Sequence, residues 1–82
     1  MTKTDIFEKV VEILKRYTKN ETALEGASAE TNILEDLRVN SARLVDVILD
    51  FEDAFNIEIA DDDADSVTTI GDALKLIEAR IG

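Results

Sequence analysis

The chain contains no Cys and no His among its 82 residues, a length that accommodates one domain with a thin hydrophobic core. Without these residues the usual general base, the cysteine nucleophile and the commonest zinc ligands are missing. The net charge of −10 disfavours nucleic acid and anionic membranes as partners, so the composition argues against an enzyme and favours a partner protein with a basic surface patch.

Residues 4–18 predict the first helix. Apolar residues recur there at helical steps, at Ile6, Val10, Ile13 and Tyr17. Thr4 is the expected N-cap. We place Lys15, Arg16 and Lys19 in the last turn, where positive charge suits the helix dipole.

A long loop is predicted next, over residues 20–40. It is rich in Ala, Glu, Thr, Ser and Asn and shows helical spacing only around Ile33, Leu34 and Leu37. One apolar turn at these three residues is expected to hold the loop against the core. An ordered loop of this length usually has a function or spans the distance between two elements.

The clearest periodicity lies in residues 41–55, which predict the central helix. Its core-facing residues follow the spacing i, i+3, i+4, i+7 and i+11, at Leu44, Val47, Ile48, Phe51 and Phe55. Asn40 is the expected N-cap. Val45 and Leu49 form a second, narrower apolar row, and the rest of the visible surface is acidic.

Two further elements complete the chain. Residues 61–66 are expected to form one short helical turn, and residues 69–81 predict the last helix, which opens with a capping-box-like pair, Thr69 and Asp72. The predicted fold is all-α: a small antiparallel bundle of three main helices plus one short helix, with a long loop between the first and second helices. Residues 1–82 are expected to form a single domain.

Ser41 stands where the long loop meets the central helix. Backbone N–H groups and the helix dipole favour a phosphate at such a place, although an isolated Ser more often only caps a helix. The sequence from Glu35 reads E-D-L-R-V-N-S-A-R-L-V-D-V-I-L-D-F-E-D-A-F-N-I-E-I, and A-D-D-D-A-D-S-V-T-T-I-G-D-A follows from Ala60. This sequence resembles that of the acyl carrier proteins.

The family pattern is an acidic loop that ends in D-S-L, then an amphipathic acidic helix, then an I-x-D/E-x-x-A-x-x-I-x-T-V/I segment and a final helix. The resemblance spans residues 31–81. The residues in register are Phe55, Ile59, Asp61, Ala64, Val67, Thr69 and Ile70. The register over this length, rather than the three letters around the serine, carries the resemblance.

The resemblance implies that Ser41 is esterified with 4′-phosphopantetheine from coenzyme A by a separate, Mg²⁺-dependent phosphopantetheinyl transferase. The thiol of this arm then holds an acyl group as a thioester, which places the chain in lipid metabolism, such as fatty acid biosynthesis. The chain itself is expected to have no catalytic residue and no metal site. Its expected partners are the transferase and the acyl-loading and acyl-transfer enzymes, which present basic patches.

By position, the resemblance also implies a partner-binding surface. Its acidic members are Asp46, Glu52, Asp53 and Asp61, and the alternative for each is an ordinary solvated carboxylate. Val45 and Leu49 match apolar positions that contact partners and line the mouth of an acyl pocket, with core packing as the alternative. The residues expected to border a cavity between the central helix and the short one are Ile59, Ala64 and Val67.

The chain departs from the family pattern around the serine. Asn40 and Ala42 replace the Asp and Leu of D-S-L, and Arg43 stands where the family usually carries an acid. Asn keeps the capping ability of Asp without its charge. We expect Asn40, Ala42 and Arg43 to alter partner contacts, so that a dedicated transferase and a specialised lipid or polyketide-type pathway are favoured.

Three alternatives remain open at this point. Asp61, Asp63 and Asp65 follow a D-x-D-x-D spacing with Asp72 at the twelfth position, as in a calcium-binding EF-hand, although Ser66 replaces the usual Gly. An unmodified acidic adaptor of the same fold and a peptidyl or aminoacyl carrier are the other two.

The compartment and the assembly state also follow as expectations. Hydrophobic residues make up 45% of the chain, too many for a disordered tail. No apolar run approaches the roughly 20 residues of a transmembrane helix, and residues 1–4 do not resemble a signal peptide. We expect a cytoplasmic protein without membrane insertion, and a monomer because the chain carries strong like charge.

Overall fold

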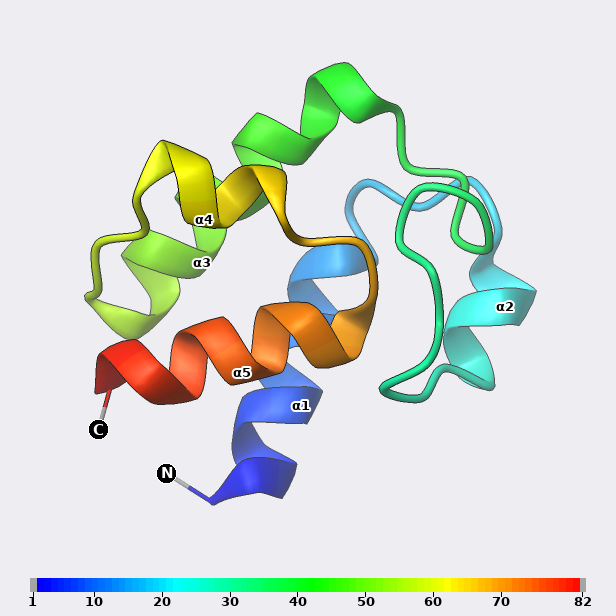
Figure 1. Cartoon of the computed structure of the whole chain (residues 1–82). Coiled ribbons are helices and arrows are strands. Elements are labelled where there is room, and N and C mark those ends of the chain that lie inside the picture. Colours follow the sequence, from blue (N-terminus) through cyan, green and yellow to red (C-terminus); the bar gives the residue numbers. More distant parts are fainter. Residues whose placement is uncertain (1, 82) are drawn as a thin grey trace.

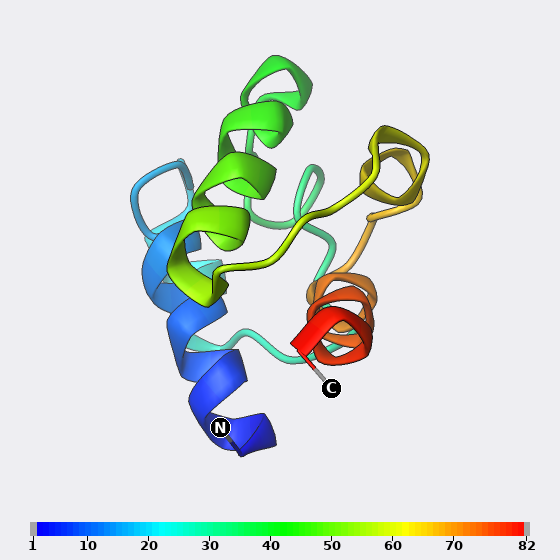
Figure 2. The same ribbon diagram turned by 90° about the vertical axis from the view of Figure 1, so that its left-hand side faces the viewer.

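The computed structural model describes residues 2–81. Its elements are α1 (Lys3–Leu14), α2 (Glu21–Glu25), the 3₁₀ turn η1 (Ser41–Arg43), α3 (Leu44–Phe55), α4 (Asp61–Asp65) and α5 (Ile70–Ile81). α1 and α3 lie side by side and run in opposite directions, and α5, seen nearly end-on in Figure 2, crosses them (Figure 1). The predicted all-α fold with three long helices is confirmed.

The core lies where the three long helices meet. Val10 of α1, Phe51 of α3 and Ile77 of α5 are fully buried, and the crossing loop adds Ile33 and Leu37. Every buried residue among those described is apolar, so burial of apolar area holds the bundle together. The predicted apolar turn of the loop is therefore confirmed as part of the core.

α1 differs from its prediction at both ends. Its N-cap is Thr2 rather than Thr4, because the hydroxyl of Thr2 accepts the N–H of Asp5 while the Asp5 carboxylate accepts the N–H of Thr2. This reciprocal pair is a capping box. The helix ends at Leu14, so placing Lys15, Arg16 and Lys19 in its last turn was wrong. The apolar spacing extends to Tyr17 because residues 15–17 form a turn that follows the helix directly.

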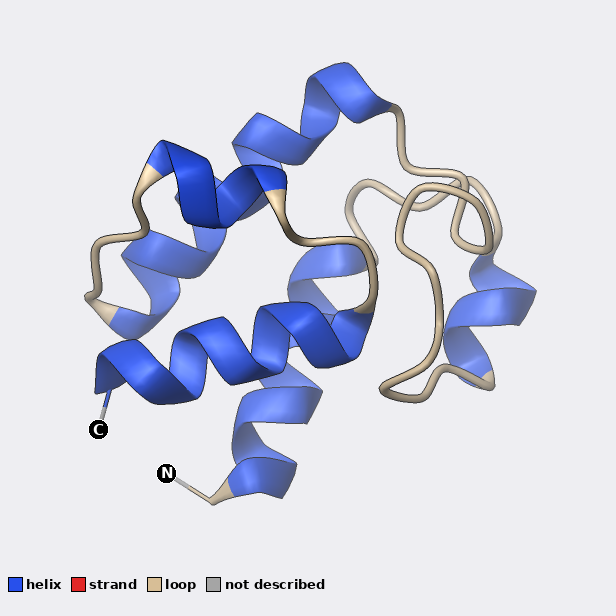
Figure 3. Ribbon diagram, in the orientation of Figure 1, coloured by secondary structure: helices blue, strands red, loops and turns tan. Residues whose placement is uncertain are grey.

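The loop between α1 and α3, predicted to have no helix, contains the short helix α2 (Figure 3). The side chain of Asn20 accepts the N–H of Ala23 and caps this helix. Only Leu24 in it is buried. One buried residue in five gives no detectable period, which explains the miss.

Three backbone hydrogen bonds fasten the crossing loop to the segment that leads into α5. The Ile33 N–H donates to the Thr68 carbonyl at 3.0 Å. The Ile70 N–H donates to the Thr31 carbonyl at 3.0 Å, and the Gly71 N–H donates to the Ala29 carbonyl at 2.7 Å. The loop is thus held in place, and it delivers the chain to the start of α3 from a fixed direction.

α3 and its flanking turns match the predicted central helix, with a 3₁₀ start. The four predicted core residues of its middle and end are buried: Val47, Ile48, Phe51 and Phe55. Leu44 is half-buried against them. The helix ends at Phe55, and the residue that follows, Asn56, adopts a left-handed conformation (φ 53°), a common way to stop a helix. The short turn predicted over residues 61–66 is confirmed as α4.

Candidate functional site

Ser41 is the first residue of η1, at the junction between the crossing loop and α3 (Figure 1). Its side chain is exposed. The side-chain hydrogen bonds of this turn involve Asn40, Arg43 and Asp46 and leave the Ser41 hydroxyl unengaged. The hydroxyl is therefore accessible to a reagent that approaches from solvent.

Asn40 caps this turn as predicted. Its side-chain oxygen accepts the N–H of Ala42 at 2.8 Å, and its carbonyl accepts the N–H of Arg43 at 2.8 Å. The Leu44 N–H donates in turn to the Ser41 carbonyl. The cap and the 3₁₀ turn thus occupy these three N–H groups. That backbone N–H groups near Ser41 favour a phosphate stays a prediction.

Arg43 supplies positive charge to the same turn. Its guanidinium lies 3.1 Å from the Asp46 carboxylate, and its side chain is 67% exposed. Ala42 is also exposed and places only a methyl group beside the serine. The surface next to Ser41 therefore carries a small side chain, Ala42, and a positively charged one, Arg43.

Val45 and Leu49 lie on the outer surface of α3. They are 64% and 55% exposed, so core packing, the alternative considered for both, was wrong. The spacing of Ser41, Val45 and Leu49 at i, i+4 and i+8 puts them on the same side of the helical segment. An apolar strip therefore continues along α3 from the serine.

A groove of about 310 Å³ runs between α3 and α4 beside this strip. Its lining consists of Val45, Ile48, Leu49, Glu52, Ile59, Asp61, Ala64 and Asp65. Ile59 and Ala64 border the groove as expected. Val67 does not line it and is buried in the core instead.

The predicted acidic positions have different local roles. Asp46 pairs with Arg43, and the Glu52 carboxylate accepts the N–H of Ile59 at 3.0 Å, which ties α3 to the segment before α4. Asp53 and Asp61 are exposed. Free carboxylates for a partner are therefore concentrated toward the far end of α3 and at α4.

Three residues of the site were not singled out from the sequence for any function. Arg16, Tyr17 and Lys19 follow α1, yet they line one hollow of about 550 Å³ together with Asn40 and Arg43. The Tyr17 hydroxyl donates to Asp50 of α3. This hydrogen bond, followed by burial and the negative charge of Asp50, raises the pKa of Tyr17. The residues are distant in sequence, and only the packing of α1 against α3 brings them together.

The EF-hand alternative was wrong. Residues 61–65 form the helix α4 rather than an open loop. Asp63 pairs with Arg80, and the Asp72 carboxylate accepts the N–H groups of Thr68 and Thr69 at 3.1 Å each. Across residues 2–81 no three carboxylates or other metal-binding side chains gather into a cluster.

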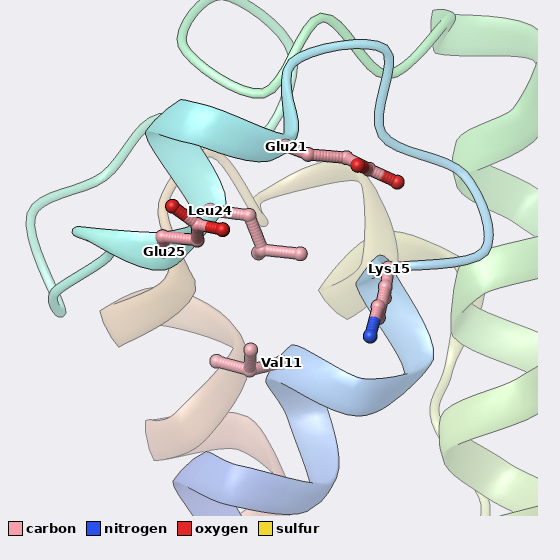
Figure 4. A pocket seen from close by; sticks show the side chains of 5 residues that line it. All are labelled: Val11, Lys15, Glu21, Leu24 and Glu25. Carbon is pink, nitrogen blue, oxygen red and sulfur yellow. The ribbon is translucent and has the colours of Figure 1, made fainter.

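A second hollow, of about 260 Å³, lies between α1 and α2. Figure 4 shows Leu24 of α2 pointing toward Val11 of α1, with Lys15, Glu21 and Glu25 around them. Its mixed charges and its single buried apolar side chain are consistent with imperfect packing under a short helix. Within residues 2–81, no helix combines the length and apolar character needed to span a bilayer.

Comparison with known proteins agrees with this arrangement of loop, exposed serine and helix. The family described as "Phosphopantetheine attachment site" matches residues 8–77. A curated acyl carrier protein from Prochlorococcus marinus (strain MIT 9515) is 34% identical over 82 residues, which cover all of both chains. One from Lactobacillus acidophilus has the same identity and coverage.

A solved structure of an acyl carrier protein from Enterococcus faecalis superposes with a TM-score of 0.79 at 28% identity, covering 98% of this chain and 99% of the other. The fold and the matched family thus define a small helical carrier that receives a phosphopantetheine arm. The chain belongs to the acyl carrier protein family. It is a carrier rather than an enzyme, and its cofactor is covalent 4′-phosphopantetheine.

Proposed function

We propose that Ser41 is the residue to which 4′-phosphopantetheine is attached. The observation that carries this proposal is the exposed, unengaged hydroxyl at the start of η1, inside the segment matched by the family. Attachment forms a bond from the Ser41 oxygen to the phosphorus that carries the pantetheine arm, and it breaks the pyrophosphate bond of coenzyme A, so that adenosine 3′,5′-bisphosphate leaves. Within the described residues no side chain is hydrogen-bonded to the Ser41 hydroxyl as a base, so the base that removes its proton comes from a separate phosphopantetheinyl transferase.

The residues around Ser41 fit an attached phosphodiester. Arg43 is exposed two positions further on and provides a favourable charge. Asn40 holds the turn through its cap without adding negative charge. When bound, the arm supplies the thiol that holds an acyl group as a thioester. The chain itself fixes the point of attachment, so that the cargo reaches successive enzymes at high effective concentration.

The partners follow from the surface around the serine. The apolar strip of Val45 and Leu49 contacts the transferase and the acyl-loading and acyl-transfer enzymes. Asp53 and Asp61 meet basic residues on the same enzymes. Asn40, Ala42 and Arg43, which replace common family residues, favour a dedicated transferase and a specialised lipid or polyketide-type pathway in the cytoplasm. Residues 1–82 act in it as a single carrier domain.

Intact-mass measurement tests the attachment. The purified chain is incubated with coenzyme A, Mg²⁺ and several phosphopantetheinyl transferases, including one from the same genome. We expect a single mass increase that equals one phosphopantetheine group. The Ser41→Ala variant is expected to show no increase.

Ser66→Ala is the matched control, because Ser66 is another exposed serine and its hydroxyl donates to the Asp63 carbonyl. This variant is expected to be modified like the unchanged chain. A mass increase that persists in Ser41→Ala would place the attachment elsewhere. No increase with any transferase would favour an unmodified adaptor of the same fold.

A further inference from the structure

A cationic pocket lies beside the junction that carries Ser41. Its volume is about 550 Å³, and the residues that line it are Arg16, Tyr17, Lys19, Asn40 and Arg43. Three of these five are cations and none is acidic, in a chain whose net charge is −10. Positive residues are outnumbered by negative ones in this chain, and solubility does not require them to cluster, because positive charges spread over the surface serve it equally well.

The fold holds the α1 side of the pocket in place. The Tyr17 and Thr18 N–H groups both donate to the Leu14 carbonyl at 2.9 Å, which closes the turn after α1. The Lys19 N–H donates to the Leu37 carbonyl at 3.1 Å. Arg16 and Lys19 therefore project from a backbone that is tied both to α1 and to the crossing loop.

The cations are more exposed than the carboxylates that pair with them. The Arg16 side chain is 65% exposed and its partner Asp50 is 32% exposed, at a separation of 3.8 Å. Arg43 is 67% exposed and its partner Asp46 is 44% exposed. Among the residues described, Lys19 forms no ion pair. The guanidinium groups of Arg16 and Arg43 and the ammonium group of Lys19 are therefore available to an approaching protein.

The pocket and Ser41 occupy adjacent faces of one turn. A 3₁₀ turn has three residues per turn, so Asn40 and Arg43 lie on one face and Ser41 lies a third of a turn away. An enzyme that encloses the Ser41 side chain therefore also covers the rim of the pocket.

We propose that this pocket receives carboxylate side chains of the enzyme that docks on Ser41. The role rests on the proposed attachment at Ser41. On the other side of the serine, Asp61 and Asp65 at the groove between α3 and α4 present the opposite charge. A docking surface with positive charge on the α1 side and negative charge on the α4 side fixes the orientation of the enzyme about the serine, and it repels an enzyme whose docking face is uniformly basic.

An NMR titration of the unmodified chain tests the pocket without requiring modification. The probes are a hexaglutamate peptide and a hexalysine peptide at low ionic strength. Hexaglutamate is expected to shift the backbone amides of Arg16, Lys19 and Arg43 in a saturable way. Hexalysine is expected to shift the amides of residues 61–65 instead.

The test variant combines Arg16→Gln, Lys19→Gln and Arg43→Gln, and the matched control is Lys9→Gln on the exposed face of α1. The triple variant is expected to bind hexaglutamate about tenfold more weakly, since three exposed charge contacts are lost. The control is expected to bind unchanged. Equal affinity in the triple variant and the unchanged chain would overturn the proposal.

Inorganic phosphate, titrated at the same charge concentration, separates a protein partner from a small anion. Phosphate shifts as large as those of hexaglutamate would overturn the proposal in favour of a small-anion site. A second measurement uses a phosphopantetheinyl transferase with a basic docking face. Its KM for the triple variant is expected to be several-fold lower than its KM for the unchanged chain. An unchanged or higher KM would contradict the proposed repulsion. If no transferase modifies Ser41 at all, the proposed attachment fails, while the peptide titration still reads the pocket.

Discussion

Single side chains close the ends of the helices in this molecule, and Asp72 is the clearest case. Its carboxylate accepts the N–H groups of Thr68 and Thr69, while the Thr69 hydroxyl accepts the Asp72 N–H at 3.1 Å. The backbone hydrogen bond from Thr69, followed by that from Thr68, lowers the pKa of Asp72 below its ordinary value. The ionised carboxylate of Asp72 is therefore more stable in the folded chain than in the unfolded one.

Replacing Asp72 by Asn tests this cap. A lowered pKa in the folded state means that Asp72 stabilises the fold above its ordinary pKa and that this contribution is lost as the pH falls through the folded pKa. We expect Asp72→Asn to lower the free energy of unfolding by about 1 kcal/mol at neutral pH. The difference should disappear between about pH 5 and pH 2. Urea unfolding across this range measures it.

Glu8→Gln on the exposed face of α1 serves as the control, because it removes a carboxylate that makes no hydrogen bond within residues 2–81. It is expected to change stability by less than about 0.5 kcal/mol. A loss for Asp72→Asn that stays constant down to pH 2 would show that the charge of Asp72 is irrelevant to the cap.

The caps also mark how far single residues were predictable. Asn40, Thr69 and Asp72 were identified correctly, because each stands directly before or within a strongly periodic stretch. Thr4 was chosen over Thr2 wrongly, since both precede the same stripe and only the position of Asp5 three residues after Thr2 distinguishes them.

At the scale of elements, the close approach of α5 to the crossing loop depends on Gly71. A Cβ atom built on Gly71 would lie 2.8 Å from the Ala29 carbonyl oxygen and 3.2 Å from the Ala29 Cβ. That oxygen also accepts the Gly71 N–H at 2.7 Å. Because the obstacle is backbone, a side chain at this position has to push α5 and the loop apart.

We expect Gly71→Ala to destabilise the fold by about 1–2 kcal/mol, despite the higher helix propensity of Ala, because the overpacked contact outweighs the propensity gain. Gly26→Ala is the matched control: nothing lies within 4 Å of its added Cβ, and its φ of −97° suits any residue. It is expected to be neutral or slightly stabilising. The midpoints of urea unfolding of the two variants measure this difference in stability. Equal midpoints would mean that the crossing loop moves away from the added methyl group at little cost.

The long helices were predictable because each contributes several residues to the core. α3 buries Val47, Ile48, Phe51 and Phe55, and its position was predicted to within its 3₁₀ start. α2 was invisible because its position is fixed by the Asn20 cap and one buried side chain. The end of α1 was missed because an apolar Tyr17 after a turn looks the same in sequence as one more helical step.

At the scale of the whole molecule, the candidate site combines a part that the sequence reveals and a part that only the fold creates. Ser41, Val45 and Leu49 are neighbours in sequence, so their common face follows from helical geometry. The cationic pocket joins Arg16 and Lys19 to Arg43 across the contact between α1 and α3. No local pattern reports a contact between segments so far apart, so the sequence predicted only a helix end for Arg16 and Lys19.

The net charge of −10 makes a prediction about the stability of the entire chain. Like charges held within a compact fold repel each other more than in the unfolded chain, and dissolved salt screens this repulsion. The three ion pairs described are exposed enough to contribute little, so their screening costs less than the repulsion that is removed. We therefore expect NaCl to stabilise the fold, by about 1 kcal/mol between 10 mM and 300 mM.

For a domain of this size 1 kcal/mol corresponds to a rise of about 4–8 °C in Tm, which circular dichroism measures directly. A variant with Glu12→Gln, Glu30→Gln and Glu35→Gln removes three exposed negative charges. It should start from a higher Tm at low salt and gain less from NaCl, because less repulsion remains to be screened. A Tm that falls as salt is added would mean that attractive pairs, including those at the rim of the cationic pocket, outweigh the global repulsion.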